Sequence, residues 1–468
     1  MDADTAFDPR LAGRVLISVS VGYFFLPFML AGVNAVLPSI GQSLHASAQD
    51  LGMISAAYTL GLAVAQLAAG RLGDIWGRKR VFLHGMELFA FTGILLCFTT
   101  SLPLFIVLRF VQGCGGALFN ASGLALLAGV TPPAARGRFL GINAAAVYAG
   151  IACGPPLSGF ITGMANWRGV FALCAAAAAV TWLLMRFSVR REWRVSAGEP
   201  FDWAGCAMYV GAMAALTCGA GCIGRHPAAG WGLSALTLLL LAAFWRWETR
   251  TPFPLLHVRL FQVNRTFALS SLASFINYSS IFGMLFFFSL YLQTARGFSV
   301  QESGLLLTTQ AVVQVLVSTW AGGLADRRGP GKVSAFGIAL CGAGILYAVT
   351  LHLQSSIWSI VLIQAIMGLG VSLFAVPNTT IILSSAGERY LGQASSVNGA
   401  VRTAGMLVNM IIVTITLGFF LGNAPAGPDT VPDLLKAMRA DFIIFGVLNL
   451  LAVGCAFSRE KKAAAPKD

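Results

Sequence analysis

The chain contains little charge for its length. Of its 468 residues only 10% are Asp, Glu, Lys or Arg, whereas 57% are hydrophobic, and the mean hydropathy is +0.77. A soluble domain carries roughly a quarter of its residues as charges, so this composition excludes a large soluble enzyme. A chain this apolar is stable only where much of its surface faces lipid. The sequence therefore predicts an integral membrane protein.

The chain also lacks the patterns typical of metal and nucleotide chemistry. Its five histidines are scattered, its nine cysteines contain no C-x-x-C pair, and no phosphate-binding G-x-x-x-x-G-K occurs. A multispan membrane enzyme needs clustered ligands or nucleophiles, so these absences argue against one. We expect no catalytic residues, no bound metal and no cofactor beyond a proton gradient.

A helix that spans a bilayer needs about 20 predominantly apolar residues. Interruptions by charges, Pro-Gly clusters and short polar runs divide the chain into fourteen such segments. The segments are residues 14–38, 51–70, 81–100, 103–129, 139–163, 168–186, 203–224, 229–247, 266–292, 303–325, 333–351, 357–384, 391–421 and 440–458. The first is long and follows mixed acids and bases, so we expect a permanent span rather than a cleaved signal peptide.

The basic residues indicate how these spans are oriented. If the N-terminus is cytoplasmic, most of the 31 lysines and arginines fall in cytoplasmic loops, as the positive-inside rule requires. The opposite side holds only Arg168, Arg225, Arg296, Lys436 and Arg439. We therefore predict a protein of the cytoplasmic (inner) membrane with both termini in the cytoplasm. The net charge of +13 reflects this topology and does not indicate a nucleic-acid partner.

Two loops share one pattern. Residues 70–80 read GRLGDIWGRKR and residues 322–332 read GGLADRRGPGK, so that Gly, Leu, Asp and Gly recur at equal offsets. Repeated halves are the usual architecture of secondary transporters, whose substrate site lies near the midplane between them. Aligned on these loops, spans 1 to 6 match spans 9 to 14, and spans 7 and 8 are an inserted pair. The predicted divisions are residues 1–188, 189–262 and 263–468.

The first of these loops resembles the signature loop of the major facilitator superfamily, and the resemblance extends over nearly the whole chain. Span 4 carries Arg109 and Gln112 in a pattern similar to the R-x-x-Q-G-x-G motif of that family. The resemblance implies an all-α membrane fold of two pseudo-symmetric six-helix halves, here with two inserted helices. It also implies a gate latch that stabilises the outward-open state. The gate residues are Gly70, Asp74, Gly77, Arg78, Asp326 and Gly329.

Span 5 is similar to the antiporter motif of the same family. The matching positions are Gly141, Gly150, Gly154, Pro155 and Gly159, with Ser158 in place of one glycine. Glycines at four-residue spacing allow close helix packing, and a proline kinks a helix. Within the family this motif marks exporters, and the fourteen spans resemble those of the drug/proton antiporter branch. The alternative interpretation is generic packing of small residues.

We therefore predict a secondary transporter that exports a small amphipathic or drug-like molecule by proton antiport with alternating access. Such a protein acts in multidrug efflux and antibiotic resistance. The alternative is a metabolite exporter or permease of narrow specificity without proton coupling. One departure from the branch favours this alternative, because Met29 occupies the span 1 position where an Asp is usual. We expect a monomer in contact with lipid and a small-molecule substrate.

Proton coupling needs a carboxylate in a low-dielectric site. Among the 18 acids, only Glu87 falls well inside a span, and His84 lies three residues earlier on the same helix face. Glu87 is therefore the proton-coupling candidate, with His84 as its partner. The alternative is a structural acid that braces the nearby gate loop.

Arg402 lies near the middle of span 13, where an unpaired cation is costly. It either attracts an anionic group of the substrate or is tied to carbonyl groups and nearby side chains. Other polar side chains lie in the spans that line the cavity in the family, and each is either a substrate contact or an interhelical hydrogen-bonding group. The substrate-binding candidates are Asn34, Tyr58, Asn120, Asn277, Gln314, Asn378 and Arg402.

Overall fold

The computed structural model describes residues 8–44, 48–222, 227–298, 300–387, 390–421 and 431–463, and within these ranges it contains helices and turns but no strand. Fourteen long helices cross the described part of the molecule. They are α1 (Pro9–Leu44), α2 (Ala48–Trp76), α3 (Arg78–Phe98), α4 (Leu102–Val130), α5 (Arg136–Met164), α6 (Arg168–Ser188), α7 (Trp203–Cys222), α8 (Pro227–Glu248), α10 (Arg265–Leu290), α11 (Val300–Arg328), α12 (Pro330–Val349), α13 (Ile357–Ala386), α14 (Leu391–Leu421) and α15 (Val431–Ala463). The short helical pieces are η1 (Pro133–Ala135), α9 (Arg259–Val263) and the π-helical η2 (Tyr291–Ala295).

Each predicted span coincides with one long helix, so the all-α fold class is confirmed. In the described residues thirteen helices are long and apolar enough to cross a bilayer, and α7 adds a shorter apolar stretch, Trp203–Gly219. Several helices extend beyond the predicted segments. For example, α15 begins at Val431 instead of residue 440. Two charged residues in this added part of the helix, Asp433 and Lys436, form an ion pair of 2.9 Å on the exposed helix surface.

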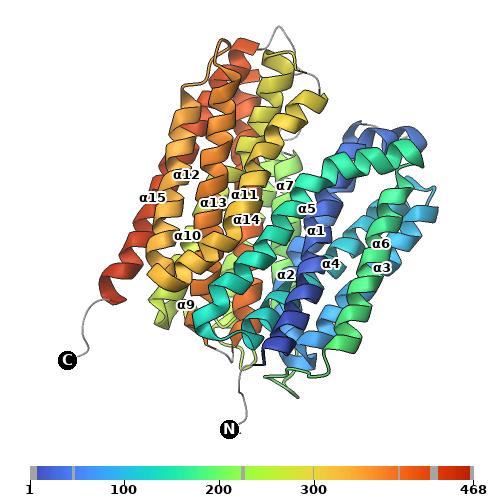
Figure 1. Cartoon of the computed structure of the whole chain (residues 1–468), viewed down its shortest axis with the longest axis vertical. Helices are drawn as coiled ribbons and strands as arrows, with labels where there is room; N and C mark the ends of the chain where they lie inside the picture. The colour runs from blue at the N-terminus through green and yellow to red at the C-terminus, as the bar shows by residue number, and fades with distance from the viewer. Residues whose placement is uncertain are drawn as a thin grey trace.

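The long helices form two groups that lie side by side in Figure 1. In the first group α1 packs on α5, α2 on α4 and α3 on α6, and in the second α10 packs on α14 and α15, and α12 on α13. The groups meet mainly through two helix pairs, α5 with α11 and α2 with α14. These pairs are equivalent under the sequence repeat, because α2 and α11 each end in one copy of the repeated loop. The inserted helices α7 and α8 pack on each other, and α7 contacts both α2 and α14.

The two groups approach closely at one end. The first residues of α1 and the last residues of α15 lie at the lower end of the molecule in Figure 1, and the groups diverge toward the upper end. At the lower end Gly137 of α5 lies against Gly322 of α11, and Gly70 of α2 lies against Gly392 of α14, with no room for a side chain at either contact. Gly159, in the upper half of α5, has no other helix within 4 Å of the place that a Cβ would occupy.

Candidate functional site

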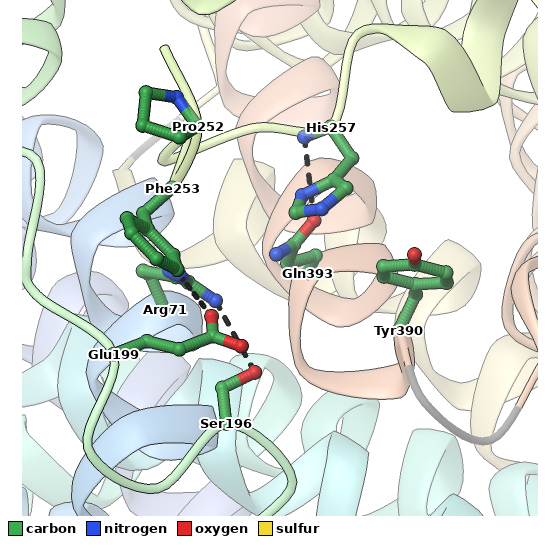
Figure 2. Close-up of a pocket in the computed structure, with 8 residues that line it drawn as sticks. All are labelled: Arg71, Ser196, Glu199, Pro252, Phe253, His257, Tyr390 and Gln393. Carbon is green, nitrogen blue, oxygen red and sulfur yellow. Dashed lines mark hydrogen bonds and ion pairs between the residues drawn. The ribbon is translucent and has the colours of Figure 1, made fainter.

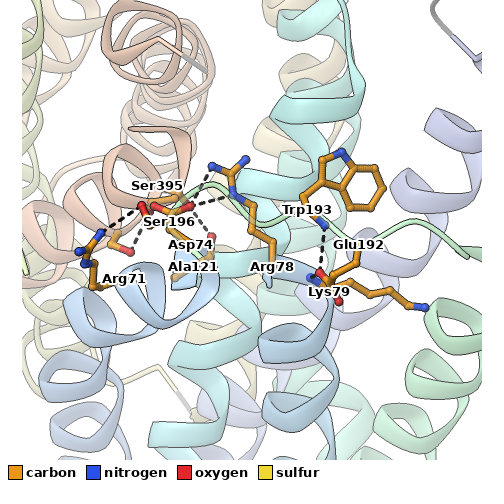
Figure 3. Close-up of polar contacts among 11 residues, drawn as sticks. Arg71, Asp74, Arg78, Lys79, Ala121, Glu192, Trp193, Ser196 and Ser395 are labelled. Carbon is orange, nitrogen blue, oxygen red and sulfur yellow. Dashed lines mark hydrogen bonds and ion pairs between the residues drawn. The ribbon is translucent and has the colours of Figure 1, made fainter. Parts of the chain in front are cut away.

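The turn between α2 and α3 holds a buried ion pair. Asp74 lies in the last turn of α2, and Arg78 is the first residue of α3. The Oδ1 atom of Asp74 accepts hydrogen bonds from Nε and Nη2 of Arg78 at 3.0 and 2.9 Å, and the two side chains are 1% and 3% exposed. Gly77 makes this turn possible because its φ of 117° lies in a region that side chains disfavour. The first gate motif thus forms one compact, charge-paired turn (Figure 3).

This ion pair faces the first turn of α14 in the other group. The backbone N–H of Gln393 donates to the Asp74 carboxylate, and Gly392 leaves no room for a side chain beside it. The first N–H groups of a helix have no partner within the helix and carry partial positive charge. Nearby, Oγ of Ser395 donates to the carbonyl oxygen of Ala121 in α4 at 2.7 Å (Figure 3). Asp74 therefore joins α2 to α14.

The second copy of the loop makes the same kind of contact at α5. Oδ1 and Oδ2 of Asp326, in the last turn of α11, accept hydrogen bonds from the backbone N–H groups of Gly137 and Arg138 at 3.0 and 2.9 Å. Both N–H groups belong to the first turn of α5. Gly329 follows with a φ of 87° and begins the turn into α12. The repeated aspartates thus hold both interfacial helix pairs together at the lower end.

The segment between α6 and α7 closes over the first of these loops, which sequence reasoning did not anticipate. The N–H of Ser196 donates to the carbonyl oxygen of Asp74 at 3.0 Å. The Glu192 carboxylate accepts from the backbone N–H groups of Lys79 and Arg80 at 2.9 and 3.2 Å, and it therefore caps the first turn of α3 (Figure 3). The only sequence signal for this role is a single acid within the basic run at residues 190–194.

A pocket of about 140 Å³ lies at the lower end, where the linkers on both sides of the inserted helices meet α2 and α14 (Figure 2). It is lined by Arg71, Ser196, Glu199, Pro252, Phe253, His257, Tyr390 and Gln393, none of which is a substrate-binding candidate. Arg71 donates to Glu199 at 2.7 Å, and the N–H of His257 donates to Oε1 of Gln393 at 3.3 Å. The first linker is therefore tied to α2 and the second linker to α14.

Glu87 is not enclosed by protein, although its position well inside a predicted span suggests a buried acid. Its side chain is 49% exposed on α3, and its Oε1 accepts from Nε1 of Trp182 in α6 at 2.8 Å. The predicted pairing with His84 is present, because Nδ1 of His84 lies 2.8 Å from Oε2 of Glu87. Depth along a span does not specify which helix face carries a residue. The coupling role of Glu87 stays a prediction, and these contacts support the structural alternative in which it braces α3 on α6.

Arg109 is fully buried in the upper half of α4. Its Nη1 donates to Oε1 of Gln112 at 2.6 Å, and its guanidinium carbon lies 4.3 Å from the ring centre of Tyr58 and 5.8 Å from that of Phe171. Contact with aromatic faces stabilises a cation electrostatically. In the part of the chain that the structure describes, Nε and Nη2 have no hydrogen-bond partner. The span 4 motif thus holds an incompletely paired cation between aromatic rings.

The motif glycines of α5 serve two different contacts. Gly141 lies against the backbone of α11, whereas Gly150 lies against a carbonyl oxygen of α1, and Gly154 lies against the backbone of α1 one turn further on. Pro155 and Gly159 are exposed in the upper half of the helix. The helix α5 therefore packs on α1 in its own group and, through its lower half, on α11 in the other group.

Arg402 lies near the middle of α14 among tyrosines from both groups. Tyr278 of α10 forms a side-chain hydrogen bond with it, and its charge also acts on Tyr23 of α1 and Tyr148 of α5. Tyr23 and Tyr148 are buried, whereas Arg402 is partly exposed. No ion pair with an acid is present for Arg402 among the described residues. A partly exposed cation that is hydrogen-bonded to one phenol group therefore lies near the middle of α14.

The other substrate-binding candidates mostly connect helices. Those at most 8% exposed are Tyr58, Asn120, Asn277, Gln314 and Asn378. Asn34 is exposed and accepts a hydrogen bond from a serine of α2 at 2.5 Å. Nδ2 of Asn378 donates to the carbonyl oxygen of Ser270 at 3.0 Å, and Oδ1 of Asn277 accepts from Nδ2 of Asn449 at 3.1 Å. These bonds match the alternative interpretation of interhelical hydrogen bonding.

Sequence reasoning missed a buried acid in α15. Asp441 is 0% exposed, and its Oδ1 accepts from Oγ1 of Thr416 in α14 at 2.8 Å, whereas its Oδ2 has no partner in the described residues. The predicted span begins at residue 440, which puts Asp441 at its end. Because α15 begins at Val431, Asp441 lies about 15 Å along the helix from its start.

The known proteins that this chain resembles are membrane transporters. The family model described as the Major Facilitator Superfamily matches residues 19–245 and 270–468. The tetracenomycin C resistance and export protein of Streptomyces glaucescens is 31% identical over 435 residues, which are 90% of this chain and 78% of that protein. The drug efflux pump JefA of Mycobacterium tuberculosis H37Rv is 28% identical and covers 92% of this chain and 85% of its own length. Among solved structures, the proton:xylose symporter XylE has a TM-score of 0.66 at 14% identity, over 95% of this chain and 94% of that chain, and this likeness concerns the fold alone.

Proposed function

The chain belongs to the Major Facilitator Superfamily and is a multi-pass membrane transporter, and from this premise we propose that it exports a small amphipathic or drug-like molecule from the cytoplasm in exchange for protons. Relatives named as export and efflux proteins support the direction of transport. The close packing of α5 on α1 through the glycines of the antiporter motif supports the same assignment.

The proposed orientation places the lower end of the molecule in the cytoplasm. The lower-end loops carry most of the lysines and arginines, as expected for cytoplasmic loops of an inner-membrane protein. In this orientation the two helix groups are closed toward the cytoplasm and diverge toward the outside. The arrangement is therefore that of an exporter in its outward-facing state.

The observation that carries the proposal is the pair of repeated carboxylates at the lower end. Asp74 binds the first turn of α14, and Asp326 binds the first turn of α5. The two groups part at this end only when both sets of contacts break. This geometry supports alternating access, in which substrate enters from the cytoplasm with the contacts broken and leaves on the other side once they re-form.

Arg402 is the proposed anchor for the substrate. The cation is partly exposed, has no acid partner among the described residues, and forms a hydrogen bond with the phenol group of Tyr278. A cation in a low-dielectric site attracts an anion strongly, and aromatic rings pack against other aromatic rings. The arrangement favours an aromatic compound that carries an acidic group.

Transport into inverted membrane vesicles tests this function. The probes are anthraquinone-2-carboxylate and its neutral carboxamide, a matched pair that differs in charge, each measured with and without a pH gradient. We expect gradient-driven uptake of the carboxylate. Arg402→Gln is expected to lower the ratio of carboxylate to carboxamide uptake by about tenfold, the loss typical of one hydrogen bond to a charged group.

The control variant is Arg439→Gln, because Arg439 is exposed on the surface of α15, and this change is expected to leave the ratio unaltered. An unchanged ratio in Arg402→Gln would remove Arg402 from substrate binding. Uptake that is indifferent to the pH gradient would favour the alternative function, a metabolite exporter or permease without proton coupling.

A further inference from the structure

Asp441 occupies a closed, apolar site between α14 and α15. Its side chain is 0% exposed, Oδ1 lies 2.8 Å from Oγ1 of Thr416, and Oδ2 has no partner in the described residues. The buried apolar side chains of the same stretch of α15 are Leu434, Met438, Phe442 and Phe445, each at most 1% exposed. Phe442 in turn packs on Phe287 and Phe288 of α10. The carboxyl group therefore has no exposed surface in this conformation.

No basic group compensates this carboxyl group in the part of the chain that the structure describes. The base of α14 is Arg402, which lies roughly 21 Å along the helix from Thr416. Arg296, beside η2, donates instead to the carbonyl oxygen of Ser355 at 2.6 Å and to the Tyr291 hydroxyl at 3.1 Å. Arg265 of α10 and Lys332 of α12 lie in the first turns of these helices, at the lower end of the molecule. Lys436 and Arg439, in the upper part of α15, are on the exposed surface. The neutral titratable groups within or against the same apolar cluster are Tyr148, Tyr278, Tyr291, Cys341 and Tyr347.

The hydroxyl group of Thr416 can form a hydrogen bond with Asp441 in both protonation states of the acid. Its one hydroxyl proton has two acceptors, the carbonyl oxygen of Ile412 at 2.9 Å and Oδ1 of Asp441 at 2.8 Å. When the acid is protonated, its O–H donates to Oγ1 of Thr416, and the Thr416 hydroxyl donates to Ile412. When the acid is ionised, the hydroxyl turns and donates to Oδ1. Removal of a carboxylate from water without a counter-charge is costly, so the closed site accommodates the neutral acid.

We propose that Asp441, with Thr416 as its hydrogen-bonding partner, is a proton-binding site of this transporter. The inference rests on the proposed proton-coupled export, and it names the carboxyl group that carries the proton. Ionisation places an uncompensated charge between α14 and α15, so it favours a conformation in which water reaches this site. The same α14 is bound to Asp74 at its lower end through Gln393. The protonation state of Asp441 is thereby linked to the position of an interfacial helix.

The first measurement uses the substrate-free protein in lipid, so its outcome is independent of transport. Infrared difference spectra between acidic and alkaline pH report the carbonyl stretching band of a protonated carboxylic acid. The chain has 18 acids that contribute to this band, so the component expected from Asp441 is the one at the high frequency of a carboxyl group in an apolar site, and we expect this component in the wild type and its loss in Asp441→Asn. Asp433→Asn, which changes an exposed acid on the same helix, is the matched control and is expected to retain the band. A spectrum that Asp441→Asn leaves unchanged would overturn the proposal.

Thr416 provides a second variant if Asp441→Asn does not fold. Thr416→Val removes the hydroxyl that faces Oδ1, so the acid band is expected to shift in frequency, and Thr416→Ser is expected to restore the wild-type frequency because it restores the hydroxyl. A band with the same frequency in all three proteins would contradict the assignment to Asp441.

Transport by proteoliposomes supplies the second measurement, with anthraquinone-2-carboxylate as the probe. Counterflow without a pH gradient is expected to be retained in Asp441→Asn, whereas gradient-driven accumulation is expected to fall about tenfold, a factor typical of coupling between two binding sites. An equal response to the gradient in the two proteins would overturn the coupling role. If the wild type also ignores the gradient, the proposed function fails, and the infrared measurement still decides whether Asp441 binds a proton.

Discussion

At the scale of single residues, Asp74 and Asp326 occupy equivalent positions in the repeat but have unequal partners. Asp74 is 1% exposed and forms an ion pair with a buried guanidinium, that of Arg78. Asp326 is partly exposed, and the hydrogen bonds of its carboxylate come from backbone N–H groups of α5. Both carboxylates therefore accept hydrogen bonds from the first turn of a helix in the other group, and Asp74 in addition forms a buried ion pair within its own group.

Asp74→Asn is expected to destabilise the protein more than Asp326→Asn. The first change leaves the Arg78 guanidinium buried without its counter-charge, which costs about 3–5 kcal/mol. The second change retains an acceptor oxygen and loses mainly the charge at the start of α5, which costs about 1 kcal/mol. Thermal unfolding of the purified variants in detergent measures the order. A lower Tm for Asp326→Asn than for Asp74→Asn would contradict the assignment of the ion pair.

The gate aspartates were predictable from sequence, whereas the burial of the other acids was not. Asp74 and Asp326 are recognised by spacing, which is a property of the chain itself. The burial of Glu87 and Asp441 does not follow from the sequence, because it depends on the helix face and on where the helix begins. A helix that is apolar on all sides carries no periodic signal for its inward face. Glu87 therefore turned out to face outward, and Asp441 to face the α14 neighbour.

At the scale of helices, the glycines of α5 differ in what a side chain would meet. Gly150 lies against the carbonyl oxygen of Phe24, whereas Gly159 has no other helix within 4 Å. Gly150→Ala forces α1 and α5 apart and is expected to cost about 1–3 kcal/mol, as overpacking does. Gly159→Ala removes a flexible residue from a helix interior and is expected to gain about 0.5–1 kcal/mol. The melting temperatures of both variants in detergent test this, and a stabilising Gly150→Ala would contradict the close α1–α5 contact.

For the inserted helices, the sequence predicts the helices themselves but not the contacts of their linkers. Hydropathy alone located α7 and α8, because each is a long apolar run. Their linkers, however, make contacts that no local pattern encodes. Glu199 reaches Arg71 of α2, and His257 reaches Gln393 of α14. Such pairs join residues that are far apart in the chain, so they follow only from the packed arrangement of both helix groups.

At the scale of the whole molecule, one repeat produces two equivalent contacts that close the same end. Under the repeat, α2 corresponds to α11 and α5 corresponds to α14, so the two interfacial helix pairs are equivalent. Each half therefore supplies one aspartate and one helix N-terminus. The repeat was visible in the sequence because both loops keep their spacing. The sequence does not predict which end is closed, because the same chain adopts both conformations of a two-state transporter. Only the contacts between helices show which conformation is present.

The orientation of the whole molecule yields the last prediction. Asn166 is exposed at the upper end between α5 and α6, and Arg191 is exposed at the lower end after α6. In a protein whose exposed Cys153 and Cys218 are replaced by serine, a membrane-impermeant maleimide applied to intact cells is expected to label Asn166→Cys. Arg191→Cys is expected to react only after permeabilisation, because basic loops stay in the cytoplasm. The reverse pattern would place the closed end outside and would contradict export from an outward-facing state.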